Sequence, residues 1–220
     1  MFVEESVEGM LTAHEARVLG CLMEKQMTTP DYYPLTLKAL TAACNQKSSR
    51  VPVMHLTTGE AGGVVNDLRS RGLVTARMDG RADRFEQHLS RKLGISSRER
   101  AVICVLMLRG MLTLNEIRIN TARMVTFDDA EALQSLLDQM MNSDQPLLVR
   151  IPRTAGQRED RYAQLLCGTP EIEAASKTSG NTGSESCDSG LHQMHERIAH
   201  LEKDVEELKA EIRKLQQSAD

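Results

Sequence analysis

Two stretches of the chain carry apolar residues with the period of a helix, and they resemble each other. In residues 11–29 and 95–113, apolar side chains recur one, four and five positions apart, the spacing of one helix face. When the stretches are aligned, Glu15 matches Glu99 and Met27 matches Met111. Each also opens with a hydroxyl residue three positions before a glutamate, the signature of a capping box. We therefore predict two equivalent helices; the alternative is a chance likeness between amphipathic helices.

The residues after the first helix predict two more helices and a hairpin. A Thr-Pro-rich break precedes a helix near residues 34–44, with Pro34 in its first turn. A polar loop then leads into a helix that opens at Thr57 with a second capping box. Two alternating runs follow, at residues 73–78 and 84–89. The Asp-Gly dipeptide between them is typical of a tight hairpin turn.

The same order follows the second helix. We predict a short helix from Thr113, capped with Glu116, a longer helix at about residues 127–142, and strands at residues 147–151 and 161–166. Three helices followed by a hairpin is the order of a winged helix, a small helix-turn-helix domain. We therefore predict a mainly α fold with small β hairpins. It would contain tandem winged-helix domains at residues 11–90 and 95–168, followed by a C-terminal coiled-coil helix.

One segment of the second equivalent helix is apolar on all sides. Residues 101–108 contain no polar side chain other than a cysteine. A helix that is apolar all round is usually buried on more than one side. We expect this helix to be the place where the two winged helices pack together or against another subunit.

The C-terminal part of the chain has a different pattern. Residues 169–190 are rich in Ser, Thr, Gly and Glu, which predicts a flexible linker. Residues 191–217 follow a heptad with branched residues at most a positions and Leu at most d positions, which favours a parallel two-stranded coiled coil. The alternative is an amphipathic helix that folds back on the body. The predicted dimerisation residues are Leu191, Met194, Ile198, Leu201, Val205, Leu208, Ile212 and Leu215.

Two strings in the first repeat are distinctive. Residues 29–36 read Thr-Pro-Asp-Tyr-Tyr-Pro-Leu-Thr, and residues 44–53 read Cys-Asn-Gln-Lys-Ser-Ser-Arg-Val-Pro-Val. Together with residues 11–19, they make the chain resemble the YceH-like family of uncharacterised bacterial proteins over about residues 10–168. The resemblance implies a pair of winged helices. It implies no catalytic or binding residue, because the family's biochemical function is not established. The linker and the heptad segment lie outside it.

Composition excludes several classes of protein. Aromatic residues make up 3% of the chain and Trp is absent, which disfavours sites that stack sugars or single-stranded bases on aromatic rings. The longest apolar run, residues 101–108, is far too short to span a membrane, and the N-terminal residues are acidic where a signal peptide is basic. Five cysteines, none in a C-x-x-C pair, are typical of reduced thiols. We therefore expect a cytoplasmic protein that does not contact a membrane.

Motifs for catalysis are absent from the sequence. The six histidines form no H-E-x-x-H motif, the glycines at 59, 62 and 63 do not form a P-loop, and no G-x-S-x-G string occurs. We therefore predict that the protein is not an enzyme, with no catalytic residues, no cofactor and no metal.

Duplex DNA is the partner that a winged helix suggests first. Polar and basic side chains occupy the loop after the second helix and the first hairpin, where phosphate contacts are expected. The alternative for the loop is that its side chains cap the flanking helices. The candidate nucleic-acid-binding residues are Asn45, Gln46, Lys47, Ser48, Ser49, Arg50, Arg77, Arg81 and Arg84.

The second repeat is less suited to DNA. Its third predicted helix begins Phe-Asp-Asp-Ala-Glu at residues 127–131, and these carboxylates would repel phosphates, although its hairpin region carries Arg150, Arg153, Arg158 and Arg161. The body is also near neutral, because residues 1–168 carry a net charge of +1 and residues 169–220 carry −5. We therefore predict a DNA-binding, regulatory protein that acts through the first repeat and dimerises through the coil. The alternative is a protein-interaction adaptor without DNA affinity, whose second winged helix holds a protein partner.

Overall fold

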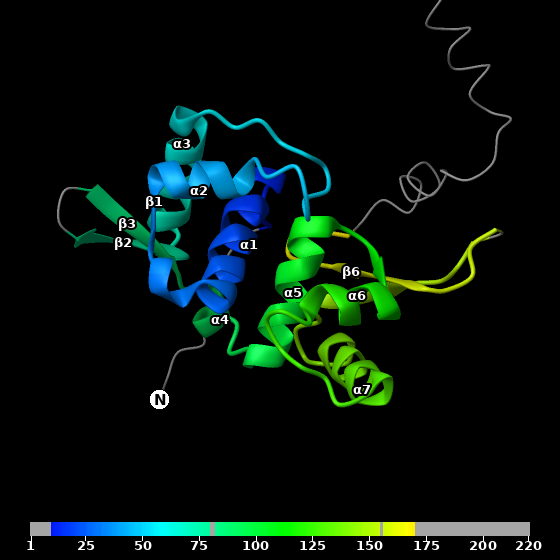
Figure 1. The fold of residues 1–220 in the computed structure, drawn as a ribbon. Coiled ribbons are helices and arrows are strands. Elements are labelled where there is room, and N and C mark those ends of the chain that lie inside the picture. The colour runs from blue at the N-terminus through cyan, green and yellow to red at the C-terminus, as the bar shows by residue number, and fades with distance from the viewer. Residues whose placement is uncertain (1–9, 80–81, 155, 170–220) are drawn as a thin grey trace, which may run out of the picture. The chain divides into compact units, whose positions relative to one another are not determined.

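The structure, a computed structural model, describes residues 10–79, 82–154 and 156–169. Arg81, the predicted linker beyond Thr169 and the predicted dimerisation residues lie outside the described residues. The described part consists of helices and two small antiparallel sheets, each of three strands (Figure 1).

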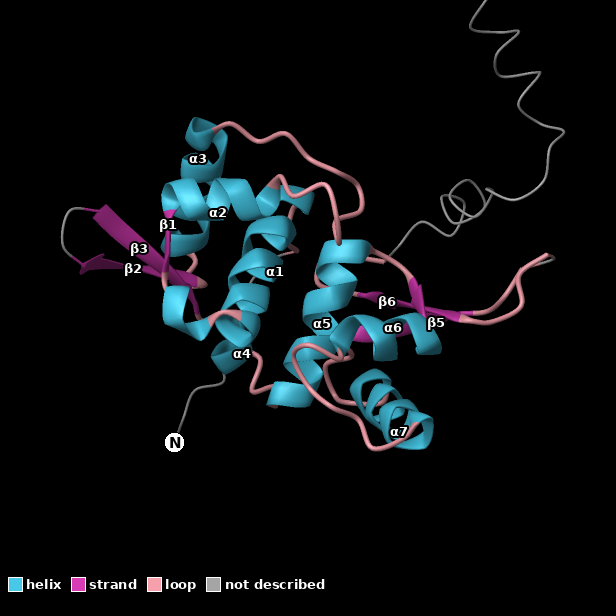
Figure 2. Ribbon diagram, viewed as in Figure 1, coloured by secondary structure: helices cyan, strands magenta, loops and turns pink. Residues whose placement is uncertain are grey.

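The elements occur in the same order twice (Figure 2). The first series is α1 (Ala13–Thr28), the 3₁₀ turn η1 (Pro30–Tyr32), β1 (Leu35–Thr36), α2 (Leu37–Cys44), α3 (Thr58–Ser70), β2 (Val74–Asp79) and β3 (Ala82–Gln87). After the short helix α4 (Leu89–Lys92), the second series is α5 (Ser97–Arg109), β4 (Leu112–Thr113), α6 (Leu114–Thr121), α7 (Ala130–Met141), β5 (Leu148–Ile151) and β6 (Arg161–Gln164). We refer to the two series as the first and the second repeat.

Capping boxes begin four of the helices. In each, a hydroxyl side chain accepts a hydrogen bond from the backbone N–H three residues on, and a glutamate accepts one from the backbone N–H of the hydroxyl residue. The prediction of these helix starts is confirmed. The pairs are Thr12 with Glu15, Thr57 with Glu60, Ser96 with Glu99, and Thr113 with Glu116.

Each hairpin has a third strand that the sequence analysis did not predict. Leu35 pairs with Phe85 in the first sheet, and Leu112 pairs with Tyr162 in the second. Because residues 35–36 are extended in β1, α2 begins at Leu37, and the prediction that Pro34 lies in its first turn is wrong.

The start of α7 also differs from the prediction. The helix begins at Ala130 rather than near Phe127, because the Asp129 side chain accepts a hydrogen bond from the Ala132 backbone N–H and caps the first turn. Asp128 and Asp129 therefore precede the helix. Their position at its N-terminal end is still the one that the helix dipole favours for carboxylates.

The centre of the described residues is the contact between α1 and α5 (Figure 1). Every residue from 101 to 108 is buried, and so are Val18 and Leu22 on α1. Gly20 allows a close approach of the two helices, because a Cβ built there would come within 2.9 Å of Leu108 Cδ2. The expectation that residues 101–108 are buried on more than one side is confirmed, and the first repeat supplies the neighbouring helix.

Backbone hydrogen bonds also join the two repeats. The Val51 N–H donates to the Leu108 carbonyl at 2.8 Å, and the Leu11 N–H donates to the Leu166 carbonyl at 2.7 Å. One hydrophobic core runs through both repeats, and the described residues belong to one compact unit. The division into separate domains at residues 11–90 and 95–168 therefore stays a prediction. Among the described residues, helices of the length and apolarity that a membrane span requires are absent.

Candidate nucleic-acid interface

Residues 45–50, which follow α2, form a turn that we call the corner. Its first residue, Asn45, is bound to the segment that leads into α3: its Nδ2 donates to the Leu56 carbonyl at 2.7 Å, and its Oδ1 accepts from the Leu56 N–H at 2.8 Å. This pair of bonds satisfies a backbone donor and acceptor that the loop would otherwise leave unpaired. Asn45 therefore has a structural role, but its side chain binds the loop backbone before the N-cap residue Thr57 rather than capping a flanking helix, which was the predicted alternative.

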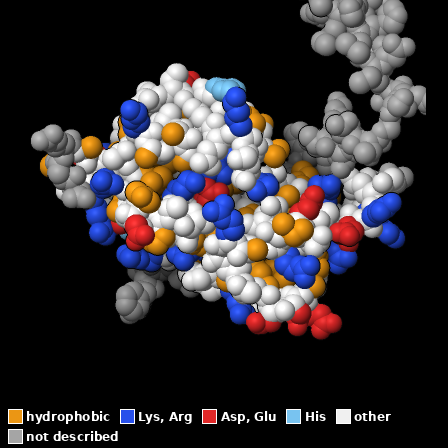
Figure 3. Space-filling model, in the orientation of Figure 1, with side chains coloured by type: hydrophobic (Ala, Val, Ile, Leu, Met, Phe, Trp, Pro, Cys, Tyr) orange, Lys and Arg blue, Asp and Glu red, His pale blue; other side chains and the backbone are white. Residues whose placement is uncertain are grey.

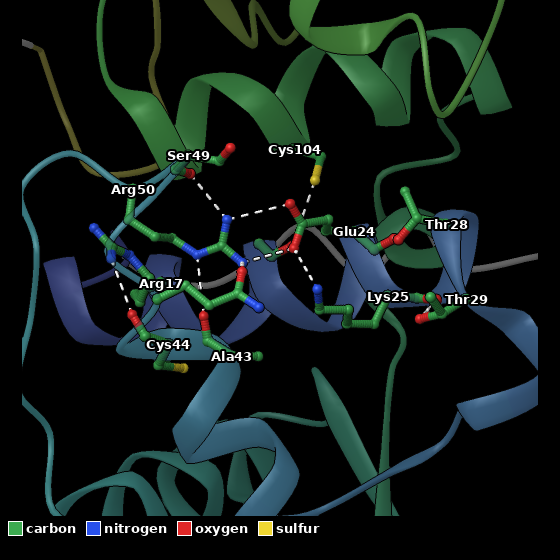
Figure 4. A network of polar contacts seen from close by, with 12 residues as sticks. Arg17, Glu24, Lys25, Thr28, Thr29, Ala43, Cys44, Ser49, Arg50 and Cys104 are labelled. Carbon is green, nitrogen blue, oxygen red and sulfur yellow. Dashed lines mark hydrogen bonds and ion pairs between the residues drawn. The ribbon is translucent and has the colours of Figure 1, made fainter.

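Arg50 is buried beneath the corner. Its side chain is 0% exposed, and its two terminal nitrogens lie 3.2 and 2.6 Å from the carboxylate oxygens of Glu24 on α1 (Figure 4). It also donates to the Ala43 carbonyl at 3.1 Å and to Gln46 Oε1 at 3.0 Å. Since two-pronged guanidinium–carboxylate pairs fix geometry strongly, Arg50 and Gln46 hold the corner against α1. In this conformation, the guanidinium of Arg50 is not open to a phosphate.

The positive charge of Arg50 lowers the pKa of its partner, Glu24. Burial alone would raise the pKa of Glu24, but the hydrogen bonds and the positive charge of Arg50 outweigh it and hold this pKa below its ordinary value. The carboxylate is therefore ionised at neutral pH, and the buried guanidinium has an ionised partner.

A second buried guanidinium lies beside the first and was not anticipated from the sequence. Arg17, 1% exposed, donates to the Cys44 carbonyl at 3.1 Å and to the Pro52 carbonyl at 2.6 Å (Figure 4). These bonds tie both ends of the corner to α1. One feature of the sequence could have indicated that Arg17 is buried: it lies directly between Ala16 and Val18 in the apolar stripe of the first helix.

Ser49 has a left-handed backbone, with φ of 61°. Its carbonyl accepts a hydrogen bond from Arg50 at 2.9 Å, and its hydroxyl accepts one from Arg109 at 2.6 Å. Arg109 is the last residue of α5, so the second repeat also holds the corner. The contact between Arg109 and this loop was not predicted from the sequence.

Lys47 and Ser48 are the corner residues that remain available to a ligand. Both are exposed, and they lie between the tethered residues Gln46 and Ser49. The structure thus presents an ammonium and a hydroxyl group on a turn whose other side chains are fixed. Such a turn suits a contact to phosphate, which positions a protein on DNA without reading its sequence.

The first hairpin supplies the remaining candidates. The Arg77 side chain is 67% exposed and forms an ion pair with Glu86 at 2.9 Å, and the neighbouring Met78 is 86% exposed. Arg84 instead donates to the Pro34 carbonyl at 3.1 Å. Arg161, its counterpart in the second sheet, donates in the same way to the Met111 carbonyl at 3.1 Å. Because both repeats make this bond, we assign Arg84 a structural role in closing the sheet.

The candidates do not form one patch. The hairpin pairs with β1, which precedes α2, whereas the corner follows α2, so the two groups lie at opposite ends of that helix (Figure 1). On the surface seen in Figure 3, Lys and Arg side chains are interspersed with acidic and apolar ones rather than gathered into one area.

The arginines of the second hairpin border a groove of about 540 Å³ against the start of α6. Asp160 forms an ion pair with Arg150 and accepts a hydrogen bond from the Arg153 backbone N–H at 2.9 Å, so it neutralises one of these arginines. Within the described residues, His, Cys, Asp and Glu side chains do not cluster in a way that could hold a metal ion.

Comparison with known proteins identifies the family. Residues 11–157 match the family described as "Protein of unknown function, DUF480". The chain is 45% identical over 213 residues to a UPF0502 protein of Cellvibrio japonicus, with 97% of each chain covered. It is 40% identical over 205 residues to one of Burkholderia multivorans, covering 93% of this chain and 87% of that one. UPF0502 protein VPA1223 of Vibrio parahaemolyticus is 39% identical over 212 residues, and the match covers 93% of this chain and 97% of that one.

The match to the Cellvibrio japonicus relative leaves only a few residues uncovered, so it extends into the heptad segment, beyond the range of the resemblance found in the sequence. The YceH-like resemblance agrees with these findings. The chain belongs to the DUF480 family, the UPF0502 group of uncharacterised bacterial proteins.

Proposed function

We propose that each repeat is a winged helix and that the protein is a tandem winged-helix protein. This assignment is supported by the repeated order of a helix, a short strand, two helices and a hairpin. It is also supported by the sheet orders β1-β3-β2 and β4-β6-β5, in which the first short strand takes the same place twice.

We further propose that the first repeat binds duplex DNA. The observation that carries this proposal is the β2–β3 hairpin, which extends away from the helices beside α3 and exposes Arg77 and Met78 (Figure 1). The sequence adds Arg81 at its turn. A basic hairpin next to the third helix can contact phosphates while that helix approaches the major groove.

The corner would provide a second phosphate contact. Lys47 and Ser48 lie at the far end of α2 from the hairpin, and phosphates recur along both strands of a duplex. A duplex that runs along α2 and α3 would therefore meet one basic group near each end of α2. The proposed contact set is Lys47, Ser48, Arg77 and Arg81. Arg77 is ion-paired with Glu86 but remains 67% exposed, whereas the other candidates are buried or half-buried and bind groups within the protein.

An adaptor without DNA affinity is the second candidate. It is favoured by the carboxylates at the start of α7, where Asp128, Asp129 and Glu131 are exposed. A surface of this charge suits a basic protein partner better than DNA. On either account, we infer a cytoplasmic protein without enzymatic activity or cofactor, which dimerises through the heptad segment.

A salt titration of the full chain with a random-sequence duplex separates the two functions. Phosphate contacts displace counterions from DNA, so affinity should fall steeply between about 50 and 200 mM salt. A linear fall of log affinity with log salt supports DNA binding. Absence of binding at about 50 mM salt contradicts it and supports the adaptor.

A further inference from the structure

Ser49 has a backbone conformation that its side chain does not favour. Its φ of 61° is in the left-handed region, which glycine enters freely and a serine enters at a cost. Residues in such conformations persist only where their surroundings hold them. Lys47 and Ser48 immediately precede this residue, so the contacts that fix Ser49 also restrain the backbone that carries these two side chains.

The contacts that hold Ser49 come from both repeats. Arg50, paired with Glu24, binds its carbonyl, and Figure 4 shows the Arg50 side chain between Ser49 and Glu24. From the second repeat, Arg109 donates to its hydroxyl at 2.6 Å. One residue further on, the Leu108 carbonyl accepts the Val51 N–H at 2.8 Å.

The position of Arg109 is electrostatically unfavourable. Burial and the neighbouring charge of Arg50 both lower the pKa of Arg109. Within the described residues, Arg109 donates its hydrogen bond to Ser49 and not to a carboxylate. The carboxylate of Glu24 opposes this effect only in part, and the contact that Arg109 makes with the corner is its hydrogen bond to the Ser49 hydroxyl.

We propose that Arg109 is a positioning residue for DNA binding: from the second repeat, it holds the corner of the first repeat in the conformation in which Lys47 and Ser48 meet phosphates of a duplex. This inference rests on the proposed DNA binding. It gives the second repeat a part in that function without any contact of its own with DNA.

The arrangement couples the repeats. Arg109 ends α5, whose residues 101–108 are buried in the shared core, so a displacement of α5 moves the donor that holds Ser49. A ligand or partner that shifts the second repeat would thereby change the affinity of the first repeat for DNA.

The first experiment measures amide hydrogen exchange in the full chain. We compare the natural protein with Arg109→Ala and with Arg98→Ala, which removes the same charge near the start of α5, where Arg98 lies 3.7 Å from Asp128. In Arg109→Ala, we expect the Val51 amide, which donates to the Leu108 carbonyl, to exchange at least about tenfold faster, as a locally opened segment does. We expect Arg98→Ala to leave its exchange unchanged. Equal exchange in all three proteins would contradict the proposal that Arg109 holds the corner.

The second experiment is a double-mutant cycle read by affinity for a random duplex. If Arg109 acts only through the corner, Arg109→Ala should weaken binding several-fold in the natural chain and have no further effect when Lys47 and Ser48 are both replaced by alanine. Additive losses would show that Arg109 contacts DNA itself and would overturn the positioning role. If the natural protein does not bind the duplex, the proposed function is contradicted. The exchange experiment does not depend on DNA, so it tests separately whether Arg109 holds the corner.

Discussion

The thiol of Cys104 donates a hydrogen bond to the carbonyl of Gly20 at 3.4 Å, and these two residues occupy equivalent positions in the two repeats, 84 residues apart. Equivalent residues meet in this way where a twofold axis relates two copies of a surface. The α1–α5 contact therefore has the geometry of a dimer interface within one chain. The third helices, α3 and α7, lie on opposite sides of this contact (Figure 1).

Replacement of Gly20 by alanine should destabilise this contact. Its new Cβ would lie 2.9 Å from Leu108 Cδ2 and 3.0 Å from Leu108 Cγ, so the buried Leu108 side chain would have to shift. Such overpacking costs about 1–3 kcal/mol. The free energy of unfolding in urea measures the effect.

Gly63→Ala is the matched control, because it makes the same replacement on α3 where a Cβ would meet nothing within 4 Å. It should stabilise the protein by up to about 1 kcal/mol through helix propensity. We therefore expect Gly20→Ala to be the less stable variant by about 1–3 kcal/mol. Equal stabilities would mean that α1 and α5 do not approach as closely as described.

Two substitutions of Ser49 should have different effects on stability. Both Ser49→Ala and Ser49→Gly remove the hydroxyl that accepts from Arg109, but only glycine relieves the left-handed φ of 61°. That conformation costs a non-glycine residue about 1–2 kcal/mol, and part of the gain is offset by the greater freedom of glycine in the unfolded chain. Thermal or urea unfolding should show Ser49→Gly to be the more stable of the two. A more stable Ser49→Ala would contradict the left-handed backbone.

The Glu24–Arg50 pair should give the stability a specific pH dependence. The pKa of Glu24 is lowered in the folded protein, so its contribution is present above the ordinary glutamate pKa of about 4.3 and is lost as the pH falls below it. Glu24→Gln leaves the Arg50 guanidinium buried without a counter-charge, which should cost about 3–5 kcal/mol at pH 7. Urea unfolding from pH 7 to pH 3 should show the difference between the two proteins shrinking. A constant difference would mean that Glu24 is not ionised beside Arg50.

Helix starts could be predicted from local patterns, because capping boxes act within a few residues. The first hairpin was also predicted, but its bounds were wrong: Asp79 ends β2 and pairs with Ala82 instead of lying between the strands, and Leu89 belongs to α4. The strands β1 and β4 could not be predicted, since two residues carry no periodicity and become strands only by pairing with β3 and β6. The burial of residues 101–108 was predictable from their composition. The choice of α1 as their neighbour depended on Gly20, which resembles any other helical glycine in the sequence.

The corner shows why candidate binding residues are harder to predict. Lys47 and Arg50 are both cations in one polar string, yet Lys47 is exposed and Arg50 is buried against Glu24. This difference in burial depends on Glu24, which lies 26 positions from Arg50 in the sequence. The structural role of Arg84 also depends on a distant partner, since it and its counterpart Arg161 each donate to a carbonyl 50 residues away in the chain.

The heptad segment, outside the described residues, should make the protein a dimer. Replacement of Leu201 and Leu208 by aspartate places charges at two predicted d positions, and we expect monomers, because the coil depends on burial of its a and d side chains. Sedimentation velocity at tens of micromolar measures the mass. The variant with aspartate at Ala210 and Gln217, two predicted f positions away from the a–d seam, is the control and should remain dimeric. A monomeric natural protein would contradict the proposal.

The most direct test of DNA binding through the first repeat compares two double variants that remove the same charge. Lys47→Ala with Arg81→Ala alters the proposed contacts, and Arg153→Ala with Arg158→Ala alters the second hairpin. Affinity for a random duplex is measured across a salt series in the full chain. The account predicts that the first variant binds more weakly and that its log–log salt slope is shallower by about 2, one for each lost phosphate contact, while the second binds almost as the natural protein does. Equal losses in the two variants, or a natural protein that does not bind at low salt, would contradict it.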